Sequence, residues 1–347
     1  MYTHLILTHR NNPRNPVTDF HANSLFAGLE GAAADALLPL AEPVAFVKGS
    51  RIARQNELAR GAWLLHTGRA EVRVRLPAGG ERVVATLDPG SAFGESALFE
   101  TGTCNASVYA VENVDGWLLP GDAFRALVLG RHPAAMRIQR NITRTLVERL
   151  SALNADLAKQ ATPEDRVAKE APPPEDPLGA IPRVKRAGFA YREFLRLLPF
   201  FQGFTPNDID AVTVGTTALE VPRGTWLFAA GHPARACYLV VRGAVEATRS
   251  IDPRERRIAV LPPGTLAGYL SLLAEKPTHG AHARTREDSL LLEFPADVFM
   301  TLYGGQGGAE IKFQHAIHRA LLTSLARSNS QMARLVTQAA LASKPAY

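Results

Sequence analysis

The sequence predicts a mainly β protein with flanking helices, built as two similar β-barrels or sandwiches that are each followed by a long helix. Three observations support this fold class: an internal repeat, short alternating segments separated by glycine turns within each repeat, and two long apolar stripes at helical spacing. A chain of 347 residues with 46% hydrophobic residues can bury two ordinary cores. We therefore expect two domains.

The internal repeat is the strongest of the three observations. Glycines and apolar residues recur at a spacing of about 175 residues, which is the period of a duplicated domain. The matching pairs include Gly49 and Gly224, Leu64 and Leu239, Gly68 and Gly243, Gly94 and Gly268, and Phe124 and Phe299. Since glycine marks turns and apolar residues mark the core, matches of this kind indicate a shared backbone.

The first half opens with a helical segment, SLFAGLEGAAADALLPL, at residues 24–40. The segments AEVRVRL and ERVVATL then flank PAGG, and Val72 and Val74 alternate with charged residues. This alternation predicts a hairpin with one buried and one solvated face. Many short strands with glycine turns indicate a barrel or sandwich. A helix from about Pro133 to Lys159 closes the half.

The second half repeats this order, with a helical segment at residues 192–214, short strands, and a helix from about Ala309 to Leu341. Both long helices carry an apolar stripe at spacings of three and four. The stripe residues are Ile142, Leu146, Leu150, Leu153 and Leu157 in the first helix, and Ile317, Leu321, Leu325, Met332 and Leu335 in the second. Such a seam packs on another helix, in the same chain or in a partner, or on its own barrel.

A segment rich in proline and acidic residues, ATPEDRVAKEAPPPEDPLGAIP at residues 161–182, separates the halves. Its composition is typical of an extended linker. We therefore expect an N-terminal tail at 1–18, a first domain at 19–160, a linker at 161–186 and a second domain at 187–347.

Composition points to a cytoplasmic protein. No apolar run approaches the roughly 18 residues of a membrane span, and the N-terminus lacks the features of a secretory signal. Cys104 and Cys237 lie far apart without metal-ligand spacing, which favours two unpaired thiols in a reducing compartment. The net charge of +6 is spread thinly along the chain and does not form a nucleic-acid footprint.

Two motifs carry a resemblance to a known family. FGE-x-AL occurs at Phe93–Leu98, and YLV-x-x-G occurs at Tyr238–Gly243. With the order of elements, these motifs resemble the cyclic-nucleotide-binding domain of catabolite activator proteins and protein kinase A regulatory subunits. The resemblance covers both halves and implies two tandem jelly-roll β-barrels, each followed by a long helix. It also implies a phosphate-binding cassette, in which glycine and helix amides face the phosphate, a glutamate accepts from the ribose 2′-hydroxyl, and an arginine pairs with the phosphate.

Carried over residue by residue, the cassette departs from the family pattern in both halves. In the first half Gly94 and Glu95 keep the glycine and glutamate places, but Cys104 stands where the arginine is expected. In the second half Tyr269 replaces the glutamate and His279 the arginine. The resemblance thus implies a nucleotide site in the first half at Gly94, Glu95, Ser96, Ala97, Cys104, Asn105 and Ala106, and a degenerate pocket in the second at Gly268, Tyr269, His279 and Gly280.

The ligand stays open at this point. Loss of a charge-assisted phosphate contact forfeits roughly 1.5–3 kcal/mol, or about one to two decades in affinity. The first pocket could bind cAMP or cGMP if it recruits Arg73, Arg75 or Arg82 from adjacent strands. Cyclic di-GMP is a further alternative, and the arginine clusters RVKR (183–186) and RERR (254–257) could bind it. The competing interpretation of these clusters is a solvated linker end and a polar hairpin loop.

No catalytic motif is present, so we expect a non-enzymatic regulatory protein with no catalytic residues. His315 and His318 lie three apart on the last helix, which we take as a solvated face without a metal, and His279 and His282 are expected to be polar surface residues.

The partners expected are a second copy or another protein, through the long helices. The alternatives are a ligand-independent scaffold with vestigial pockets, a cyclic di-GMP effector and an unconventional DNA-binding regulator. DNA binding is not expected, because the sequence ends at Tyr347 without the helix-turn-helix that follows the long helix in activator relatives.

Overall fold

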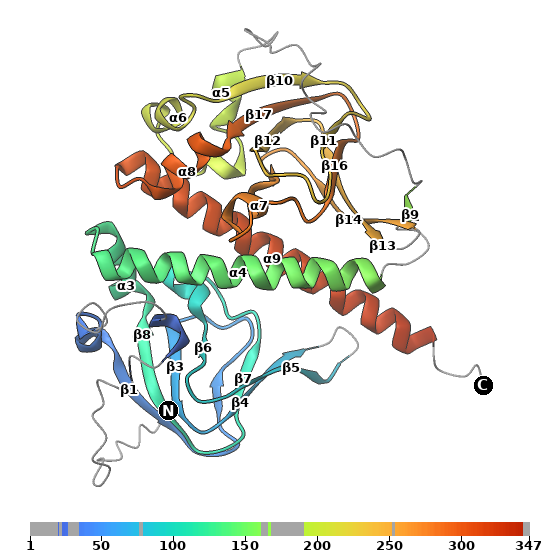
Figure 1. The fold of residues 1–347 in the computed structure, drawn as a ribbon. Helices are drawn as coiled ribbons and strands as arrows, with labels where there is room; N and C mark the ends of the chain where they lie inside the picture. The colour runs from blue at the N-terminus through green and yellow to red at the C-terminus, as the bar shows by residue number, and fades with distance from the viewer. Residues whose placement is uncertain are drawn as a thin grey trace. The chain divides into compact units, whose positions relative to one another are not determined.

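The computed structural model describes residues 20, 23–26, 35–75, 79–160, 166–167, 191–251 and 254–342 (Figure 1). The chain divides into two compact units, Met1–Thr143 and Arg144–Tyr347. Each unit contains one of the two β-barrels that the repeat predicted.

The first barrel is built from eight short strands in two antiparallel sheets. Its elements are β1 (Glu42–Phe46), β2 (Arg51–Ala53), β3 (Gly61–Thr67), β4 (Ala70–Arg75), β5 (Glu81–Leu87), β6 (Ala92–Phe93), the 3-10 helix η3 (Glu95–Leu98), β7 (Ser107–Ala110), β8 (Val114–Pro120) and α3 (Gly121–Leu129). The sheets have the strand orders β1-β8-β3-β6 and β2-β7-β4-β5. Val72 of β4 packs on the barrel core. Val74 is only half-buried, as are the charged residues beside it, and β5 is almost wholly exposed, so the predicted buried face of this hairpin is confirmed only at Val72.

The second barrel repeats this arrangement. Its elements are α5 (Tyr191–Leu195), η5 (Pro199–Phe201), α6 (Pro206–Val212), β10 (Thr217–Val221), β11 (Trp226–Phe228), β12 (Ala236–Arg242), β13 (Val245–Ile251), β14 (Arg254–Leu261), β15 (Leu266–Ala267), α7 (Tyr269–Leu273), β16 (His282–Thr285), β17 (Ser289–Pro295) and α8 (Ala296–Gly304). The sheets have the orders β10-β17-β12-β15 and β11-β16-β13-β14-β9. The shared strand order confirms the duplication. One addition, β9 (Arg166–Val167), pairs with the edge strand β14.

The two long helices are α4 (Pro133–Gln160) and α9 (Gly308–Ala342), close to the predicted ranges. The expected opening helix of the first half is described only as 3-10 turns at Ser24–Phe26 and Leu38–Leu40, and residues 27–34 lie outside the described residues. The RVKR cluster also lies outside them. The RERR cluster belongs to strand β14, so its interpretation as a hairpin loop is wrong.

The later part of α4 belongs to the second unit, which begins at Arg144. Val147 and Leu150 lie in the same buried cluster as Tyr269 of α7. Ser328 of α9 also forms a hydrogen bond of 3.0 Å with Asn154. Pairing between the two long helices of one chain, one of the alternatives for the apolar stripes, is therefore present in this part of α4.

A membrane-crossing helix is not found among the described residues, since none of their helices is both long and apolar enough.

Candidate functional site

The cassette of the first repeat begins at a glycine that the backbone requires. Gly94 has φ 74°, and a Cβ atom there would lie 2.8 Å from the carbonyl oxygen of Gly61. Only glycine adopts this left-handed turn so close to another backbone without strain. The turn starts η3, where the amide of Ala97 donates to the Gly94 carbonyl at 3.0 Å. Glu95 follows directly and its side chain is buried.

Helix α3 holds the far end of this cassette. Arg125 donates from Nη1 to the carbonyl oxygen of Ala97. A Cβ atom on Gly121 would lie 2.3 Å from the same oxygen, so the start of α3 lies directly on the cassette backbone. In the second repeat the position of Arg125 is taken by Met300, which is 47% exposed. The cassette is therefore tied to the following helix by an arginine only in the first repeat.

The place of the expected arginine is occupied by a neutral thiol. Cys104 is half-buried, and its amide donates to the carbonyl of Glu57 at 2.8 Å. Burial raises the pKa of the Cys104 thiol, and the negative charge of Glu57 raises this pKa further. Asn105 is exposed and Ala106 is half-buried. The Glu57 carboxylate is itself paired with Arg54 at 3.1 Å, so the phosphate place has an uncharged thiol beside an exposed ion pair.

The arginines suggested as substitutes do not surround the cassette. Arg73 forms an ion pair of 2.7 Å with Glu71, and its guanidinium lies 4.8 Å from the ring centre of Tyr109. Val72 packs in the barrel core, so its neighbour Arg73 lies on the outer face of the sheet. Arg75 and Arg82 are exposed on the same hairpin. Arg73 therefore contacts Glu71 and Tyr109 on the outer face of the sheet, and Arg75 and Arg82 are exposed to solvent.

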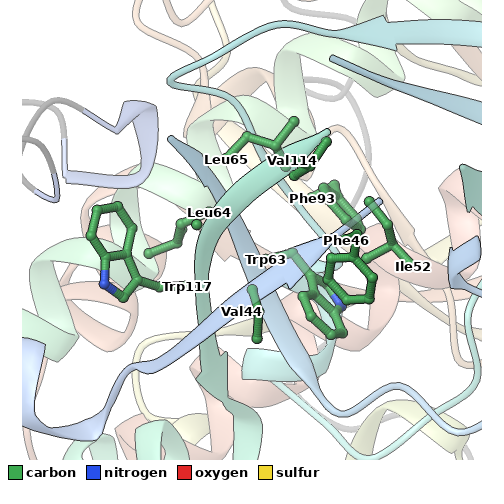
Figure 2. Close-up of a pocket in the computed structure, with 10 residues that line it drawn as sticks. Val44, Phe46, Ile52, Trp63, Leu64, Leu65, Phe93, Val114 and Trp117 are labelled. Carbon is green, nitrogen blue, oxygen red and sulfur yellow. The ribbon is translucent and has the colours of Figure 1, made fainter. Parts of the chain in front are cut away.

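An apolar hollow borders the cassette inside the first barrel. Figure 2 shows its lining, where Trp63 stacks on Phe93 at 6.2 Å between ring centres and meets Phe46 edge-on at 5.6 Å. The space measures about 180 Å³ with its opening to solvent, below the range of about 300–1,000 Å³ for ordinary ligand pockets. Phe93 immediately precedes Gly94, but the hollow is not lined by any residue from Gly94 to Ala106, and Trp63 and Phe93 are buried in the barrel core.

The second cassette starts at the same kind of turn, with Gly268 at φ 86°, but the residue in the glutamate place has another use. Tyr269 is 4% exposed and its hydroxyl lies 3.3 Å from the hydroxyl of Ser324 on α9. Burial raises the pKa of Tyr269 to about 12. Tyr269 therefore joins the cassette helix α7 to α9 through the core of the second unit.

The residue in the arginine place of the second repeat is also buried. The His279 ring is 4% exposed and stacks on Phe228, with ring centres 3.7 Å apart and planes 9° from parallel. Its Cε1 lies 3.2 Å from where a Cβ of Gly268 would be. Burial and, to a smaller extent, His232 together lower the pKa of His279 to about 4. His279 is thus a neutral ring in the cassette, and its assignment to the polar surface is wrong.

The histidines of the last helix also differ from the expectation. His318 is 1% exposed and its Nε2 lies 3.4 Å from the hydroxyl of Tyr303. Burial lowers the pKa of His318 to about 3 and also lowers the pKa of His315. The solvated-face interpretation is therefore wrong for His318. Within the described parts of the chain, no group of three or more His, Cys, Asp or Glu residues could hold a metal ion.

Sequence reasoning missed three residues that shape the two cassettes, namely Arg125, Phe228 and Ser324. A signal for Arg125 was available, because the repeat alignment pairs it with an apolar Met300. No sequence signal pointed to Ser324, which lies 55 positions from Tyr269.

Comparison with known families gives one result that covers both repeats. The family model for the cyclic nucleotide-binding domain matches residues 43–130 and 218–305. The two matches together span half of the chain, and each contains one cassette.

Individual relatives match over shorter stretches. The chain is similar to the CRP-like cAMP-activated global transcriptional regulator of Mycobacterium tuberculosis, with 27% identity over 134 residues, 39% of this chain and 58% of that protein. It is also similar to the acetyltransferase Pat of Mycolicibacterium smegmatis, with 31% identity over 32% of this chain and 33% of that protein. Among solved structures, the regulatory domain of Toxoplasma gondii PKA with cAMP matches at 19% identity, covering 84% of this chain and 91% of that chain with a TM-score of 0.32. The chain thus spans a little more than half the length of the first of these curated relatives and a third of the length of the second.

Proposed function

Because the chain belongs to the cyclic nucleotide-binding domain family, with two tandem copies of the domain, we propose that it is a non-enzymatic regulatory protein with one working ligand site. The first domain binds a ribose-containing ligand on its cassette. The second domain keeps its cassette closed without a ligand, and the long helices carry the response to a protein partner or a second copy.

The observation that carries this proposal is the retained Gly94–Glu95 corner beside an altered phosphate place. The buried carboxylate of Glu95 supplies an acceptor for sugar hydroxyls, and Gly94 gives the turn that sets this carboxylate in place. Charge-assisted hydrogen bonds of this kind contribute roughly 1.5–3 kcal/mol each. The rings of Trp63 and Phe93 stack on each other directly before the Gly94 corner, but both are buried in the barrel core and are not open to a base.

Charge favours a ligand without a phosphate in this site. Cys104 supplies no positive charge, Arg54 is paired with Glu57 at 3.1 Å, and Arg73 is held by Glu71. A nucleoside needs no positive charge in this place, whereas the phosphate of a cyclic nucleotide would lie beside a neutral thiol and would gain no ion pair while Arg54 stays paired with Glu57. We therefore propose that nucleosides bind the first domain at least as tightly as cAMP or cGMP do.

The second domain supports the proposal by contrast. Tyr269 contacts Ser324 in the core, so the place of the ribose acceptor holds no carboxylate. The stacked pair of Phe228 and His279 lies where the phosphate would be bound. A ligand would have to displace both buried contacts, and we propose that the second cassette binds no ligand.

The regulatory role rests on the relatives as well as on the site. The Mycobacterium tuberculosis relative is a cAMP-activated transcriptional regulator, while the acetyltransferase is matched over only a third of its length. The free thiols Cys104 and Cys237 fit a reducing compartment, and we place the protein in the cytoplasm.

A thermal-shift panel on the full chain tests this function. We expect adenosine or guanosine to raise the melting temperature, with cAMP and cGMP giving equal or smaller shifts at the same concentration. Glu95→Gln should remove the shift, and the matched change Tyr269→Phe in the second cassette should leave it in place. Shifts that survive Glu95→Gln, or that appear only with cyclic nucleotides, would contradict the proposal.

A ligand-independent scaffold is the second candidate, favoured by the closed second cassette. It predicts no shift with any nucleoside or nucleotide. A DNA-binding regulator would instead retard random duplex in a salt-dependent way.

A further inference from the structure

The loops that close the two cassettes have the same backbone hydrogen bonds. The amide of Cys104 donates to the carbonyl of Glu57 at 2.8 Å, and the amide of His279 donates to the carbonyl of His232 at 2.9 Å. An isolated β-bridge beside this loop also recurs in both repeats. Cys104 and His279 therefore occupy equivalent places in the two barrels.

A second pair of equivalent positions lies on the strand that faces this loop. Ala53 of β2 pairs with Val108 of β7, and Phe228 of β11 pairs with Ala283 of β16 in the same register. Ala53 and Phe228 are therefore equivalent as well. The second repeat thus has an aromatic ring at both positions, where the first repeat has a methyl group and a thiol.

The two rings of the second cassette lie against its glycine corner. A Cβ atom on Gly268 would lie 3.0 Å from the Phe228 ring and 3.2 Å from the His279 ring. Apart from its chain neighbours, the described atoms nearest to the same point on Gly94 belong to strand β3. We call the volume beside Gly94 that corresponds to these two rings the ring place.

Burial differs between the two cassettes as the missing rings require. Phe228 and His279 are 8% and 4% exposed, whereas Ala53 and Cys104 are half-buried. Phe93 is the large side chain next to the first corner, and it is buried in the barrel core. Among the described residues, no side chain therefore covers Ala53 and Cys104 as the rings cover the second cassette.

We propose that the ring place of the first cassette binds a planar, uncharged nitrogen heterocycle. The second repeat shows which group this backbone accepts, because His279 is such a ring and stacks on Phe228 with ring centres 3.7 Å apart. In the first repeat the ring of a ligand takes this position, between Ala53 and Cys104. An uncharged ring suits these side chains, since neither of them compensates the desolvation of a charge.

This inference deepens the proposed function, and it rests on that function only for the sugar. The base of a nucleoside is a planar heterocycle, and Glu95, which directly follows Gly94, is the proposed acceptor for the ribose hydroxyls. The ring place therefore assigns the base of the ligand to the position where the family pattern has its phosphate arginine.

Calorimetric titration of the full chain at neutral pH tests the ring place with two probes, benzimidazole and adenosine. Benzimidazole carries no ribose, so its binding reports on the ring place without Glu95. The variant Ala53→Phe/Cys104→His, called the filled variant, installs the ring pair of the second repeat. Its matched control, Ala85→Phe/Thr86→His, adds the same two side chains to the exposed strand β5.

We expect benzimidazole to bind the wild-type chain with a dissociation constant on the order of 1 mM, which a fragment of this size can reach. The filled variant should bind both probes about tenfold more weakly or worse, because its own rings occupy the ring place. The control should change neither affinity by more than about twofold, since β5 is outside the cassette. If the filled variant does not fold, Cys104→His alone should still weaken both probes about tenfold.

The outcomes separate the ring place from the proposed function. No binding of benzimidazole by the wild-type chain at millimolar concentration, or equal losses in the filled variant and the control, would overturn the ring place. Adenosine that binds the filled variant as tightly as the wild type would also overturn it and would leave the role of Glu95 intact. Benzimidazole binding that the filled variant blocks, with adenosine bound no more tightly than benzimidazole, would support the ring place and contradict the proposed function.

Discussion

Cys104 occupies the place where the family pattern has an arginine, and we propose that this one side chain decides which ligands the first cassette can hold. Its thiol is half-buried beside the carboxylate of Glu57, and its pKa is raised, so it stays neutral. Glu95 remains buried at the start of η3. The pocket thus keeps a sugar acceptor and lacks a phosphate donor.

Cys104→Arg should therefore convert the preference of this pocket. We expect affinity for a cyclic mononucleotide to rise by about one to two decades, since a guanidinium in a partly desolvated cradle gains a charge-assisted phosphate contact. Titration calorimetry with cAMP measures the gain. Glu95→Ala in the same background should remove most of it.

The matched change His279→Arg tests whether the gain is specific to the first cassette. We expect it to add no cAMP binding, because Tyr269 leaves the second cassette without a ribose acceptor. A gain as large as that of Cys104→Arg would show that the second pocket is open after all.

At the scale of elements, the second half of α4 is the least expected feature. Its apolar stripe predicted that the helix packs on another element, but the sequence did not identify that element. In the structure, Val147 and Leu150 contribute to the core of the second unit. Leu150 is 1% exposed, whereas Leu153 is only half-buried. Leu150 is therefore packed within the chain, and Leu153 is packed less tightly.

Leu150→Glu should destabilise the second unit by roughly 3–5 kcal/mol, because it places an unpaired charge in a packed core. Hydrogen exchange of α9 measures this loss as faster exchange of the helix amides. Leu153→Glu, the control on the same helix, should cost much less. Equal effects of the two changes would show that the α4 stripe has no preferred contact in this unit.

The elements also show what a sequence can and cannot predict. Glycines and apolar residues at a fixed spacing predicted both barrels, and apolar stripes at helical spacing predicted both long helices, because turns and cores leave local patterns. The strand of RERR was missed, since Arg254, Glu255, Arg256 and Arg257 offer no apolar alternation. The contact from Tyr269 to Ser324 and the stacking of His279 on Phe228 were also missed, because they depend on tertiary packing between segments far apart in the chain.

At the scale of the whole molecule, the second unit carries several buried neutral histidines. The pKa of His279 is lowered to about 4 and that of His318 to about 3, both mainly by burial. The unfolded chain therefore binds more protons than the folded unit below about pH 6.5, and stability falls as the pH falls.

The second unit should accordingly lose about 2.5 kcal/mol between pH 6 and pH 5 from this pair of imidazoles. The loss is a little below the limit of about 1.4 kcal/mol per group and pH unit, because the imidazoles of the unfolded chain are not fully protonated at pH 6. Chemical denaturation at a series of pH values measures the slope. His279→Phe keeps the stacking on Phe228 and should roughly halve that slope. A flat profile over this range would contradict the burial of both rings.

The domain boundary is a further property of the whole chain. We propose that residues 187–347 fold alone but need the end of α4 for full stability, since the contact division falls after Thr143 and not in the proline-rich linker. A fragment of residues 144–347 should melt several degrees above a fragment of 187–347. Identical melting temperatures would favour a boundary in the linker at 161–186.

The central claim is that the chain has one working ligand site, in the first domain. Titration calorimetry of the full chain with the nucleoside that gives the largest thermal shift tests it most directly. The account predicts one ligand per chain, with binding abolished by Glu95→Gln and unchanged by Tyr269→Phe. Two ligands per chain, or one ligand whose binding survives Glu95→Gln, would contradict it.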